Sequence, residues 1–495
     1  MLLVVDLPSM NPACGELNEE TYVITHSSHF IAGAWVPPET DETIEVTDAS
    51  QGVVMATVPA GTAGDVERAV HAARQAFPSW SALDAAQRVA YLKLAAQELG
   101  RRQNEIAAMV SRETGMPYAT SNVVQVGLPL MTLSATSEVA LDYTFEERLY
   151  NSLVIKKPVG VVASITPWNY PLHQIVAKIA PALAAGCTVV AKPSEVAPLS
   201  AFVLAEVFEA IGLPPGVFNL VCGDGPTVGE ALVAHPDIDM VTFTGSTAAG
   251  KRIGAVAAQT VKRVSLELGG KSPLVVLDDA DPVAAVTAAI GGCCLNSGQT
   301  CIALTRLIVP AARKAEYEAI AKAAAEQIVV GDPFEPASVI GPLSCAAQQE
   351  RVRGYISSGI DEGATLLAGG VNPPDGLEHG YYVRPTVFTD TTPDMRIVKE
   401  EIFGPVLVIQ TYETEDEAVA LANGTVYGLN AGVYSASVER AVTFARRLES
   451  GQVQINDGAF NIQAPFGGVK QSGNGRELGR AGFEDFLETV SLQLP

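Results

Sequence analysis

Val159-Gly-Val-Val-Ala-Ser-Ile165 is an apolar, β-branched run that leads directly into the turn Thr166-Pro-Trp-Asn-Tyr-Pro171. Apolar runs of the same kind follow at residues 188–191, 217–221, 240–243 and 264–268. Stretches with helical character separate these runs, one beginning after Pro198 and another near Thr227. Strands that alternate with helices in this way predict a mostly parallel sheet with helices on both faces. The region from about 158 to 268 therefore indicates an α/β fold.

Helix and strand patterns continue on both sides of this region. Residues 63–79 and 84–114 carry apolar residues three and four apart, which predicts amphipathic helices. A second α/β series begins at Pro273-Leu-Val-Val-Leu277 and runs to about residue 470. Residues 483–494 alternate like an edge strand that could pair with another subunit. Residues 1 to about 28 show no such periodicity and are interpreted as an extension.

Composition narrows the classes of function. The 495 residues suffice for about three domains, and the net charge is −23 with its cations scattered. Such a surface repels nucleic acid and anionic lipid, and we find no apolar run of about 18 residues for a membrane span. The N-terminus lacks the cationic start of a signal peptide. The expectation is a cytoplasmic protein without nucleic-acid or membrane partners.

The cysteines are sparse and their number, seven, is odd. None forms a Cys-x-x-Cys pair, which argues against a disulfide framework and a zinc ribbon. His26 and His29 are spaced like metal ligands but lie in a polar N-terminal segment, so no metal site is predicted. Most of the cysteines are interpreted as buried and structural, namely Cys187, Cys222, Cys293, Cys294 and Cys345. Cys14 falls on the extension.

Cys301 stands apart because it ends the segment Asn296-Ser-Gly-Gln-Thr-Cys301, after a helix rich in small residues. This pattern favours a thiol held on a loop that a substrate can approach, although a buried structural cysteine remains the alternative. Glu267-Leu-Gly-Gly270 places a carboxylate at a strand end, where it could be a general base or merely an ion-pair partner. Asn169 follows another strand end and could donate to an oxyanion or cap the next helix.

Two glycine patterns compete as the dinucleotide site. Gly223-Asp-Gly225-Pro-Thr-Val-Gly229 is similar to the Rossmann fingerprint Gly-x-Gly-x-x-Gly, but its last gap is one residue too long. Pro226 also removes an N–H that could have bound a phosphate. Phe243-Thr-Gly245-Ser246 is the better candidate, because Ser246 opens a helix whose free N–H groups can hold a phosphate. Lys192 and Glu195 follow a strand and could clamp ribose hydroxyls.

Together these segments resemble the aldehyde dehydrogenase superfamily, from about residue 30 to the end of the chain. The matching segments are Thr166-Pro-Trp-Asn169, Lys192-Pro-Ser-Glu195, Phe243-Thr-Gly245-Ser246, Leu266-Glu267-Leu-Gly-Gly270, Gly298-Gln-Thr-Cys301, Glu400-Glu401-Ile-Phe403-Gly-Pro405 and Pro465-Phe466-Gly-Gly468. Their order and near-family spacing make the resemblance specific.

The resemblance implies a role for each segment. Cys301 would be the nucleophile, Glu267 the base that activates water, and Asn169 the oxyanion donor, with Lys178 near them. The implied cofactor is NAD⁺, with NADP⁺ possible, and the implied contacts are Ile165, Thr166, Pro167, Trp168, Lys192, Ser194, Glu195, Gly225, Gly245, Ser246, Glu401 and Phe403. Glu195 favours NAD⁺, because a carboxylate repels a 2′-phosphate, although Lys192 partly offsets this. The implied reaction oxidises an aldehyde to a carboxylic acid through a thioester.

The resemblance also implies the architecture and the substrate pocket. A Rossmann-type NAD-binding domain would comprise residues 1–137 and 157–266, and an α/β catalytic domain 267–475. A small β oligomerisation arm would comprise 138–156 and 476–495, in a homodimer or homotetramer. The aldehyde pocket would be lined by Tyr170, Ala177, Phe460 and Phe466, with His173 nearby. This pocket favours an apolar or aromatic aldehyde, and no Arg or Lys is placed for a dicarboxylic semialdehyde.

Three other functions compete with this interpretation. A CoA-acylating or phosphorylating relative would attack the same thioester, but Glu267 is the base that hydrolysis requires. A cysteine hydrolase would need a histidine in a matching local signature, and none accompanies Cys301. A non-catalytic binding protein on the same fold would not need Cys301, Glu267 and Asn169 together.

Overall fold

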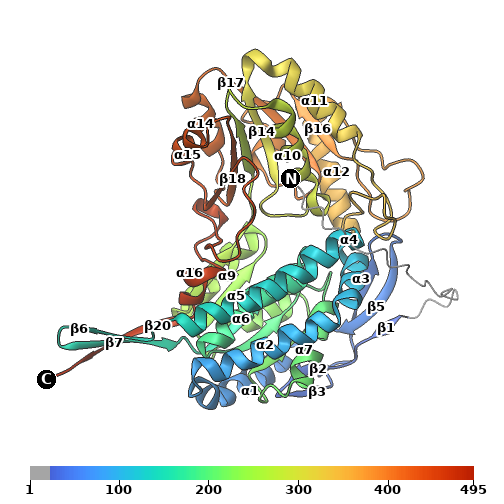
Figure 1. Cartoon of the computed structure of the whole chain (residues 1–495). Helices are drawn as coiled ribbons and strands as arrows, with labels where there is room; N and C mark the ends of the chain where they lie inside the picture. Colours follow the sequence, from blue (N-terminus) through green and yellow to red (C-terminus); the bar gives the residue numbers. More distant parts are fainter. Residues whose placement is uncertain (1–22) are drawn as a thin grey trace.

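The computed structural model describes residues 23–495. Most of the predicted extension, Cys14 and the first limit of the predicted NAD-binding domain lie outside the described residues. The described chain forms two lobes with a narrow arm that projects from the first lobe (Figure 1). Each lobe is built around a seven-stranded sheet.

The first lobe contains the region from which the fold was predicted. Its strand order is β12-β11-β8-β9-β10-β2-β3, and the five strands from β12 to β10 are parallel. The strands are β2 (His29–Ile31), β3 (Ala34–Val36), β8 (Val161–Ile165), β9 (Thr188–Lys192), β10 (Phe218–Leu220), β11 (Met240–Thr244) and β12 (Arg263–Glu267). The prediction of an α/β fold with a mostly parallel sheet is confirmed.

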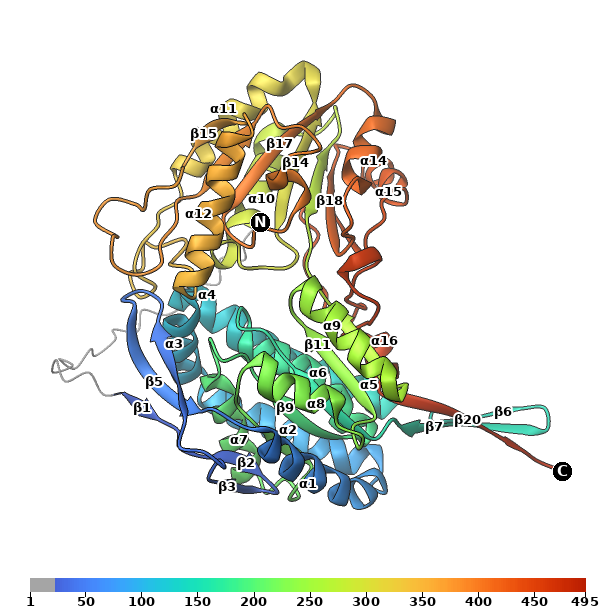
Figure 2. The same cartoon turned by 180° about the vertical axis from the view of Figure 1, so that it is seen from behind.

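Helices cover both faces of this sheet. Alternate residues of β8 point to opposite sides, so Val162 packs in one apolar cluster while Val161 and Ala163 pack in another. One face carries α2 (Ala85–Arg101), α3 (Gln103–Thr114), α5 (Leu128–Asp142), α6 (Pro171–Ala185) and α7 (Leu199–Ala210). The other carries α1 (Ala63–Ser81), α8 (Glu230–Ala234) and α9 (Thr247–Ala257), which face the viewer in Figure 2.

The helix predicted over 84–114 is two helices, because the chain breaks at Arg102. This residue leaves the helical region with φ −97° and ψ 11°. Its guanidinium group donates to Glu105 in α3 and, at 2.7 Å, to Glu206 in α7. Gly100, whose carbonyl accepts the Arg102 N–H, lies two residues before the break, but a single glycine inside a helical pattern does not show that the helix ends there.

Tyr118 to Asp142 is a helical stretch that, by length and composition alone, is apolar enough to cross a membrane. It comprises α4 (Tyr118–Ser121), the π-helix η1 (Asn122–Gly127) and α5. In the structure α5 packs against α2 and α6, and its side chains Leu133 and Ala140 are buried in the core of the lobe. The stretch therefore serves as a core helix of the first lobe.

The second lobe is built on the order β15-β16-β17-β14-β13-β18-β19, in which only β15 runs antiparallel to its neighbour. The strands are β13 (Ser272–Val276), β14 (Leu304–Pro310), β15 (Thr365–Ala368), β16 (Thr386–Thr389), β17 (Val406–Tyr412), β18 (Asn430–Tyr434) and β19 (Gln452–Ile455). The helices are α10 (Pro282–Cys294), α11 (Lys314–Glu326), α12 (Ala346–Asp361), α13 (Arg396–Lys399), α14 (Glu415–Asn423) and α15 (Val438–Ala445).

Short helical turns complete the two lobes. They are the π-helix η2 (Gly225–Gly229) and the 3₁₀ turns η3 (Ala258–Thr260), η4 (Leu295–Gly298), η5 (Ala311–Arg313) and η6 (Lys470–Ser472). The helix predicted near Thr227 thus begins as a π turn before α8. A small sheet at the edge of the first lobe has the order β1-β5-β4, from β1 (Ile24–Thr25), β4 (Thr43–Asp48) and β5 (Val53–Pro59).

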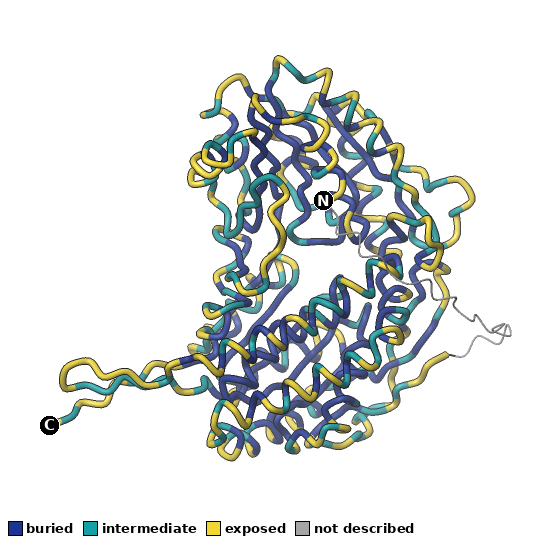
Figure 3. The backbone as a smooth tube through the Cα atoms, viewed as in Figure 1, coloured by how far each residue is buried: buried dark blue, intermediate teal, exposed yellow. Residues whose placement is uncertain are grey.

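The arm is a three-stranded antiparallel sheet. Its order is β20-β7-β6, from β6 (Glu146–Leu149), β7 (Ser152–Pro158) and β20 (Leu487–Gln493). Its residues are mostly exposed, unlike the dark core of the lobes (Figure 3). Two helical segments of the predicted arm belong elsewhere, since residues 138–142 end α5 and α16 (Gly479–Glu484) packs on α5 and α6. The predicted domain limits stay a prediction.

Candidate active site

A pocket of about 740 Å³ lies between the two lobes, where the carboxyl ends of β8, β11 and β12 meet loops from the second sheet. Its lining brings together segments far apart in the sequence. The lining residues are Pro167, Trp168, Asn169, Thr244, Gly245, Ser246, Leu268, Gly269, Cys301, Gln348, Arg351, Glu401 and Phe403. Ligands bind outside the carboxyl ends of strands in open α/β sheets, so this is the candidate active site.

The backbone before Cys301 is strained. Asn296, Ser297 and Gly298 have φ of 51°, 55° and 77°, three successive left-handed residues. Asn296 Nδ2 donates to the Asn169 carbonyl at 3.0 Å, and Ser297 Oγ donates to the Gly341 carbonyl at 2.8 Å. A Cβ at Gly298 would collide with the Gly404 backbone. This fixed turn presents Cys301 to the pocket.

Gln299 joins the cysteine loop to the candidate oxyanion donor. Its side chain is fully buried and bonds with the Thr114 carbonyl at 3.2 Å and the Ser344 N–H at 2.8 Å. Its own carbonyl accepts Asn169 Nδ2 at 2.8 Å. An amide nitrogen carries two hydrogens, so Asn169 keeps a second donor on the same nitrogen. The contact fixes where that donor lies relative to the Cys301 loop.

Cys301 is half-buried and its pKa is raised to about 12. Burial is the main cause, followed by the nearby charges of Glu401, Glu267 and Glu477. The resting thiol is therefore protonated at neutral pH. The nucleophile is the thiolate, and a cationic ligand that enters the pocket would favour it by offsetting the negative charges around Cys301.

Glu267 ends β12 and is 3% exposed. Neither of its carboxylate oxygens has a hydrogen-bond partner among the described residues. Burial and the charge of Glu477 raise its pKa well above the usual value, while Lys178 lowers it. Lys178 Nζ, also buried, donates to Glu477 and to Thr244 Oγ1, the latter at 2.5 Å. A buried carboxylate with a raised pKa is suited to take a proton near neutral pH.

The residues predicted to hold the nicotinamide end of the cofactor line the pocket. Glu401 accepts the Gly270 N–H at 2.9 Å, and burial raises its pKa to about 7. The rings of Phe403 and Trp168 meet edge to face with centroids 5.4 Å apart. A Cβ at Gly269 would collide with the Glu401 carboxylate, so only glycine permits this arrangement.

Ser246 is the residue predicted to contact a phosphate of the cofactor. It is the N-cap of α9, and its Oγ accepts the Ala249 N–H at 3.2 Å. Gly245 precedes it, and a Cβ there would collide with the Phe243 ring. The first turn of a helix has free N–H groups and a positive dipole end, which suits an anion.

The remaining predicted cofactor contacts lie outside the pocket lining. Ile165 ends β8 and pairs with Lys192 at the end of β9, while Thr166 N–H donates to the Lys192 carbonyl at 3.1 Å. Lys192 Nζ reaches the partly exposed carboxylate of Glu195 at 3.3 Å. The other two, Ser194 and Gly225, lie in the turns after β9 and β10. These residues extend the site along the edge of the first sheet.

The predicted substrate residues form an apolar wall beside Cys301. Ala177 and Phe466 share a buried cluster with Leu429 and Leu478, against which Cys301 packs. Phe460 meets Phe466 edge to face with centroids 6.1 Å apart. The fourth, Tyr170, is buried and its hydroxyl hydrogen-bonds with Thr300 Oγ1 at 2.6 Å.

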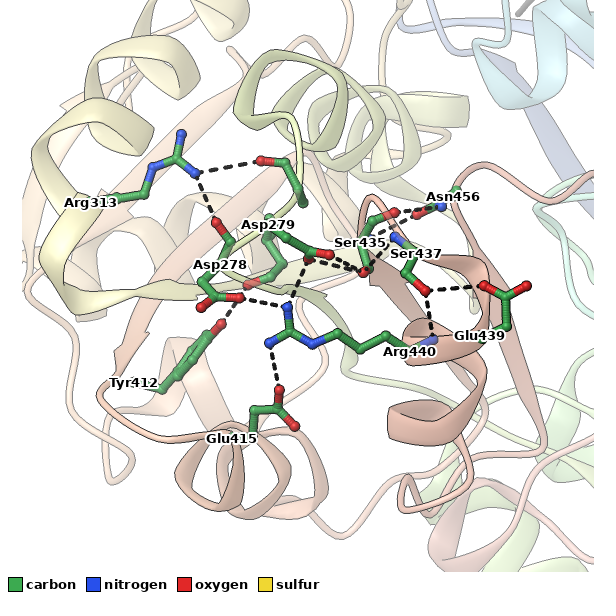
Figure 4. Close-up of polar contacts among 12 residues, drawn as sticks. Asp278, Asp279, Arg313, Tyr412, Glu415, Ser435, Ser437, Glu439, Arg440 and Asn456 are labelled. Atoms are coloured by element: carbon green, nitrogen blue, oxygen red, sulfur yellow. Dashed lines mark hydrogen bonds and ion pairs between the residues drawn. The ribbon is translucent and has the colours of Figure 1, made fainter.

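A polar network fixes where the segment with Phe460 leaves the second sheet (Figure 4). Asn456, directly after β19, bonds both backbone groups of Ser435, at 3.0 Å to its N–H and 2.8 Å to its carbonyl. Ser435 Oγ contacts both carboxylate oxygens of Asp279, which also pairs with Arg440 at 3.1 Å. The network anchors the start of the apolar wall.

A comparison with protein families identifies the family. The model of the Aldehyde dehydrogenase family matches residues 35–492. This chain belongs to the aldehyde dehydrogenase family. The 3-succinoylsemialdehyde-pyridine dehydrogenase of a Pseudomonas species is 48% identical over 470 residues, covering 94% of this chain and 97% of that protein.

Solved aldehyde dehydrogenases share the fold. The aldehyde dehydrogenase C of Pseudomonas syringae, a mutant in complex with NAD⁺ and octanal, matches with a TM-score of 0.93 and 47% identity, over 94% of this chain and 96% of that one. The Mycobacterium tuberculosis enzyme in complex with NAD⁺ matches with a TM-score of 0.93 and 41% identity, over 96% and 99%. The predicted aldehyde dehydrogenase fold is confirmed.

Some residues of this aldehyde dehydrogenase site escaped the sequence interpretation. Gln348 and Arg351, from α12, line the pocket and bond to the Phe403 and Glu401 carbonyls at 2.7 and 2.6 Å. Glu477, the partner of Lys178, was also missed. None of the three stands in a local motif, and Glu477 lies 299 residues from Lys178. Only the tertiary structure reveals them.

Proposed function

We propose that this chain oxidises an aldehyde to the carboxylic acid with NAD⁺, through a thioester on Cys301 that water activated by Glu267 hydrolyses. The observation that carries the proposal is the single pocket that Cys301, Asn169, Ser246, Glu401 and Phe403 line together. Family membership and the NAD⁺ complexes of the neighbouring structures support it.

The residues of the pocket fit a dinucleotide. Ser246 offers a helix N-terminus for the phosphates, and Glu401 offers a carboxylate to ribose hydroxyls. Trp168 and Phe403 offer aromatic faces beside Cys301. When bound, NAD⁺ supplies the acceptor for the hydride that leaves the Cys301 adduct.

The chain's own residues perform the other steps. The Cys301 thiol gives up its proton to solvent and adds as the thiolate to the aldehyde carbon, and Asn169 Nδ2 and the Cys301 N–H donate to the oxyanion. One such donor contributes about 3–4 kcal/mol to the transition state. After hydride loss the thioester remains, and Glu267 takes a proton from water, whose hydroxide attacks the acyl carbon and releases the thiolate.

A direct assay tests this proposal by following NADH formation with an aldehyde panel. We expect Cys301→Ala to abolish activity, whereas Cys345→Ala, at a partly exposed cysteine outside the pocket lining, keeps it. Added CoA should not raise the rate, because water is the acyl acceptor. Activity that persists in Cys301→Ala, or that requires CoA, contradicts the mechanism.

We also propose that NAD⁺ is preferred over NADP⁺, because the carboxylate of Glu195 beside Lys192 repels a 2′-phosphate. Replacing Glu195 by Gln removes this charge and keeps the shape. The ratio of kcat/KM for NAD⁺ over NADP⁺ should fall roughly tenfold, about 1.4 kcal/mol. An unchanged ratio contradicts this role of Glu195.

The proposed substrate is an apolar or aromatic aldehyde. The wall of Ala177, Phe460 and Phe466 supports this class, as does the octanal complex of the Pseudomonas syringae relative. In the same panel octanal and an aryl aldehyde should have higher kcat/KM than succinic semialdehyde. A preference for succinic semialdehyde would contradict the proposed pocket.

The proposed setting is the cytoplasm, and the proposed assembly is a homodimer or homotetramer joined through the arm. The six cysteines of the described chain are free thiols, as in a reducing compartment. Within the described residues β20 is paired on one side only, by β7, and an open strand edge can accept a further strand.

A further inference from the structure

A second, small cavity lies in the second lobe close to the cysteine loop. Leu429 and Asn430 line it and also support that loop, since Leu429 packs with Ile302 and Asn430 Nδ2 donates to the Ile302 carbonyl at 2.9 Å. The proposed mechanism uses none of the polar side chains that line this cavity. They are Lys271, Arg306, Asn423, Asn430, Ser450, Tyr427 and Glu449.

Three buried polar atoms of this cavity have no hydrogen-bond partner among residues 23–495. They are Lys271 Nζ, Asn430 Oδ1 and Ser450 Oγ. The Lys271 side chain is 2% exposed, and a buried ammonium group without a partner is strongly disfavoured. Orphaned polar atoms that converge on one cavity indicate a polar occupant.

Arg306 adds a second buried cation to the same wall. It is 1% exposed, and its guanidinium group donates to the carbonyls of Lys271, Leu421 and Ala422 at 2.9, 2.6 and 2.7 Å. These are neutral acceptors, so no hydrogen-bonded carboxylate within the described chain balances its charge.

Among the unpartnered atoms of the cavity the donors outnumber the acceptors, while the Glu449 carboxylate in its lining is paired with Lys470 at 3.1 Å. An ammonium group carries three hydrogens and a hydroxyl one, against the single orphaned amide oxygen of Asn430. We propose that this cavity binds a small monovalent anion, such as chloride, on the ammonium group of Lys271. The anion pairs the buried charge and accepts the free donors of Lys271 and Ser450.

The position of the site links it to the catalytic loop. Lys271 directly follows Gly270, whose N–H bonds Glu401 and where a Cβ would collide with the Cys301 carbonyl. Lys271 precedes β13, Arg306 lies in β14 and Asn430 opens β18. A bound anion therefore holds together three neighbouring strands beneath Cys301.

Binding should weaken as the pH rises. Burial and Arg306 lower the pKa of Lys271 to about 7, while Cys293, Glu401 and Glu400 act in the opposite direction. Tyr427 and Glu449 also face the cavity. Since the anion requires the charged amine, its half-saturating concentration should rise about tenfold for each pH unit above the Lys271 pKa.

Thermal unfolding of the full chain with bromide as the probe tests the proposal. Sodium bromide is compared with sodium gluconate at equal ionic strength and about pH 6. Because an anion that binds only the folded state stabilises it, bromide should raise the unfolding midpoint of the wild type. Lys271→Met should abolish this rise. Lys322→Met, which removes an exposed lysine of α11, should retain it.

Crystals of the wild type soaked in bromide provide a measurement that does not depend on a variant that folds. An anomalous peak within hydrogen-bond distance of Lys271 Nζ supports the site. Absence of that peak, absence of a bromide-specific rise in the wild type, or an equal rise in Lys271→Met would each overturn the proposal. Because neither readout involves aldehyde oxidation, the result is independent of the proposed function.

Discussion

Lys178 contacts one buried carboxylate and acts at a distance on another. It donates to Glu477 and, by its charge, lowers the otherwise raised pKa of Glu267. A general base works only when deprotonated, so the rate of thioester hydrolysis falls as the pH drops through the Glu267 pKa. Lys178 therefore extends activity toward lower pH.

Replacing Lys178 by Met should raise the Glu267 pKa further. We expect the acid limb of the kcat–pH profile to move to higher pH, while Lys178→Arg, which keeps the charge, moves it less. Stability should fall by about 3–5 kcal/mol in Lys178→Met, because Glu477 loses its buried partner. An acid limb that stays in place or moves to lower pH would refute this role of the lysine.

At the scale of elements, one side chain, that of Asn456, holds the position of the segment after β19. Asn456 has φ 46°, a conformation that Asn tolerates better than most residues, and it bonds both backbone groups of Ser435. Asn456→Ala should lower the free energy of unfolding by about 3 kcal/mol, because it removes two hydrogen bonds and leaves alanine in a left-handed conformation that it disfavours. It should also raise KM for octanal, because Phe460 follows four residues later.

Urea unfolding and steady-state kinetics measure both effects. Glu439→Ala, which removes an exposed hydrogen bond at the rim of the same network, serves as the control. If Asn456→Ala lost stability without any change in KM, the network would be structural but would not position the substrate wall.

The sequence predicted the parallel core of the first lobe because its strands are buried on both faces and stand out as apolar runs. It did not predict the break at Arg102, which depends on Glu206 in a distant helix. It also did not reveal the left-handed turn over Asn296 to Gly298, since Asn296 and Gly298 tolerate this conformation but Ser297 gives no local signal for it. Contacts distant in sequence decide such features.

At the scale of the molecule, the arm is the element proposed to join subunits. Val490 lies in the middle of β20, opposite Ile155. Val490→Pro removes a backbone donor and disrupts the strand. In light scattering coupled to size exclusion, the variant should shift toward the monomer mass of 51.8 kDa. Ser491→Ala should keep the wild-type mass, and an unchanged mass in Val490→Pro would refute assembly through this strand.

The candidate site illustrates what sequence can and cannot provide at this scale. Cys301, Glu267 and Asn169 can be predicted as site residues because each stands in a recognisable segment at a strand or loop end. Gln348 and Arg351 lie on an ordinary amphipathic helix, and only the packing of α12 against the Glu401 loop brings them to the pocket.

The most direct test of the mechanism traps the thioester. In Glu267→Gln the base is lost while Cys301 and the pocket remain, so one NADH per active site should form in a burst with octanal and NAD⁺. Intact and peptide mass spectrometry should then find one octanoyl group on Cys301, which Cys301→Ala cannot carry. A Glu267→Gln enzyme that turns over at the wild-type rate, or an acyl group on another residue, would contradict the account.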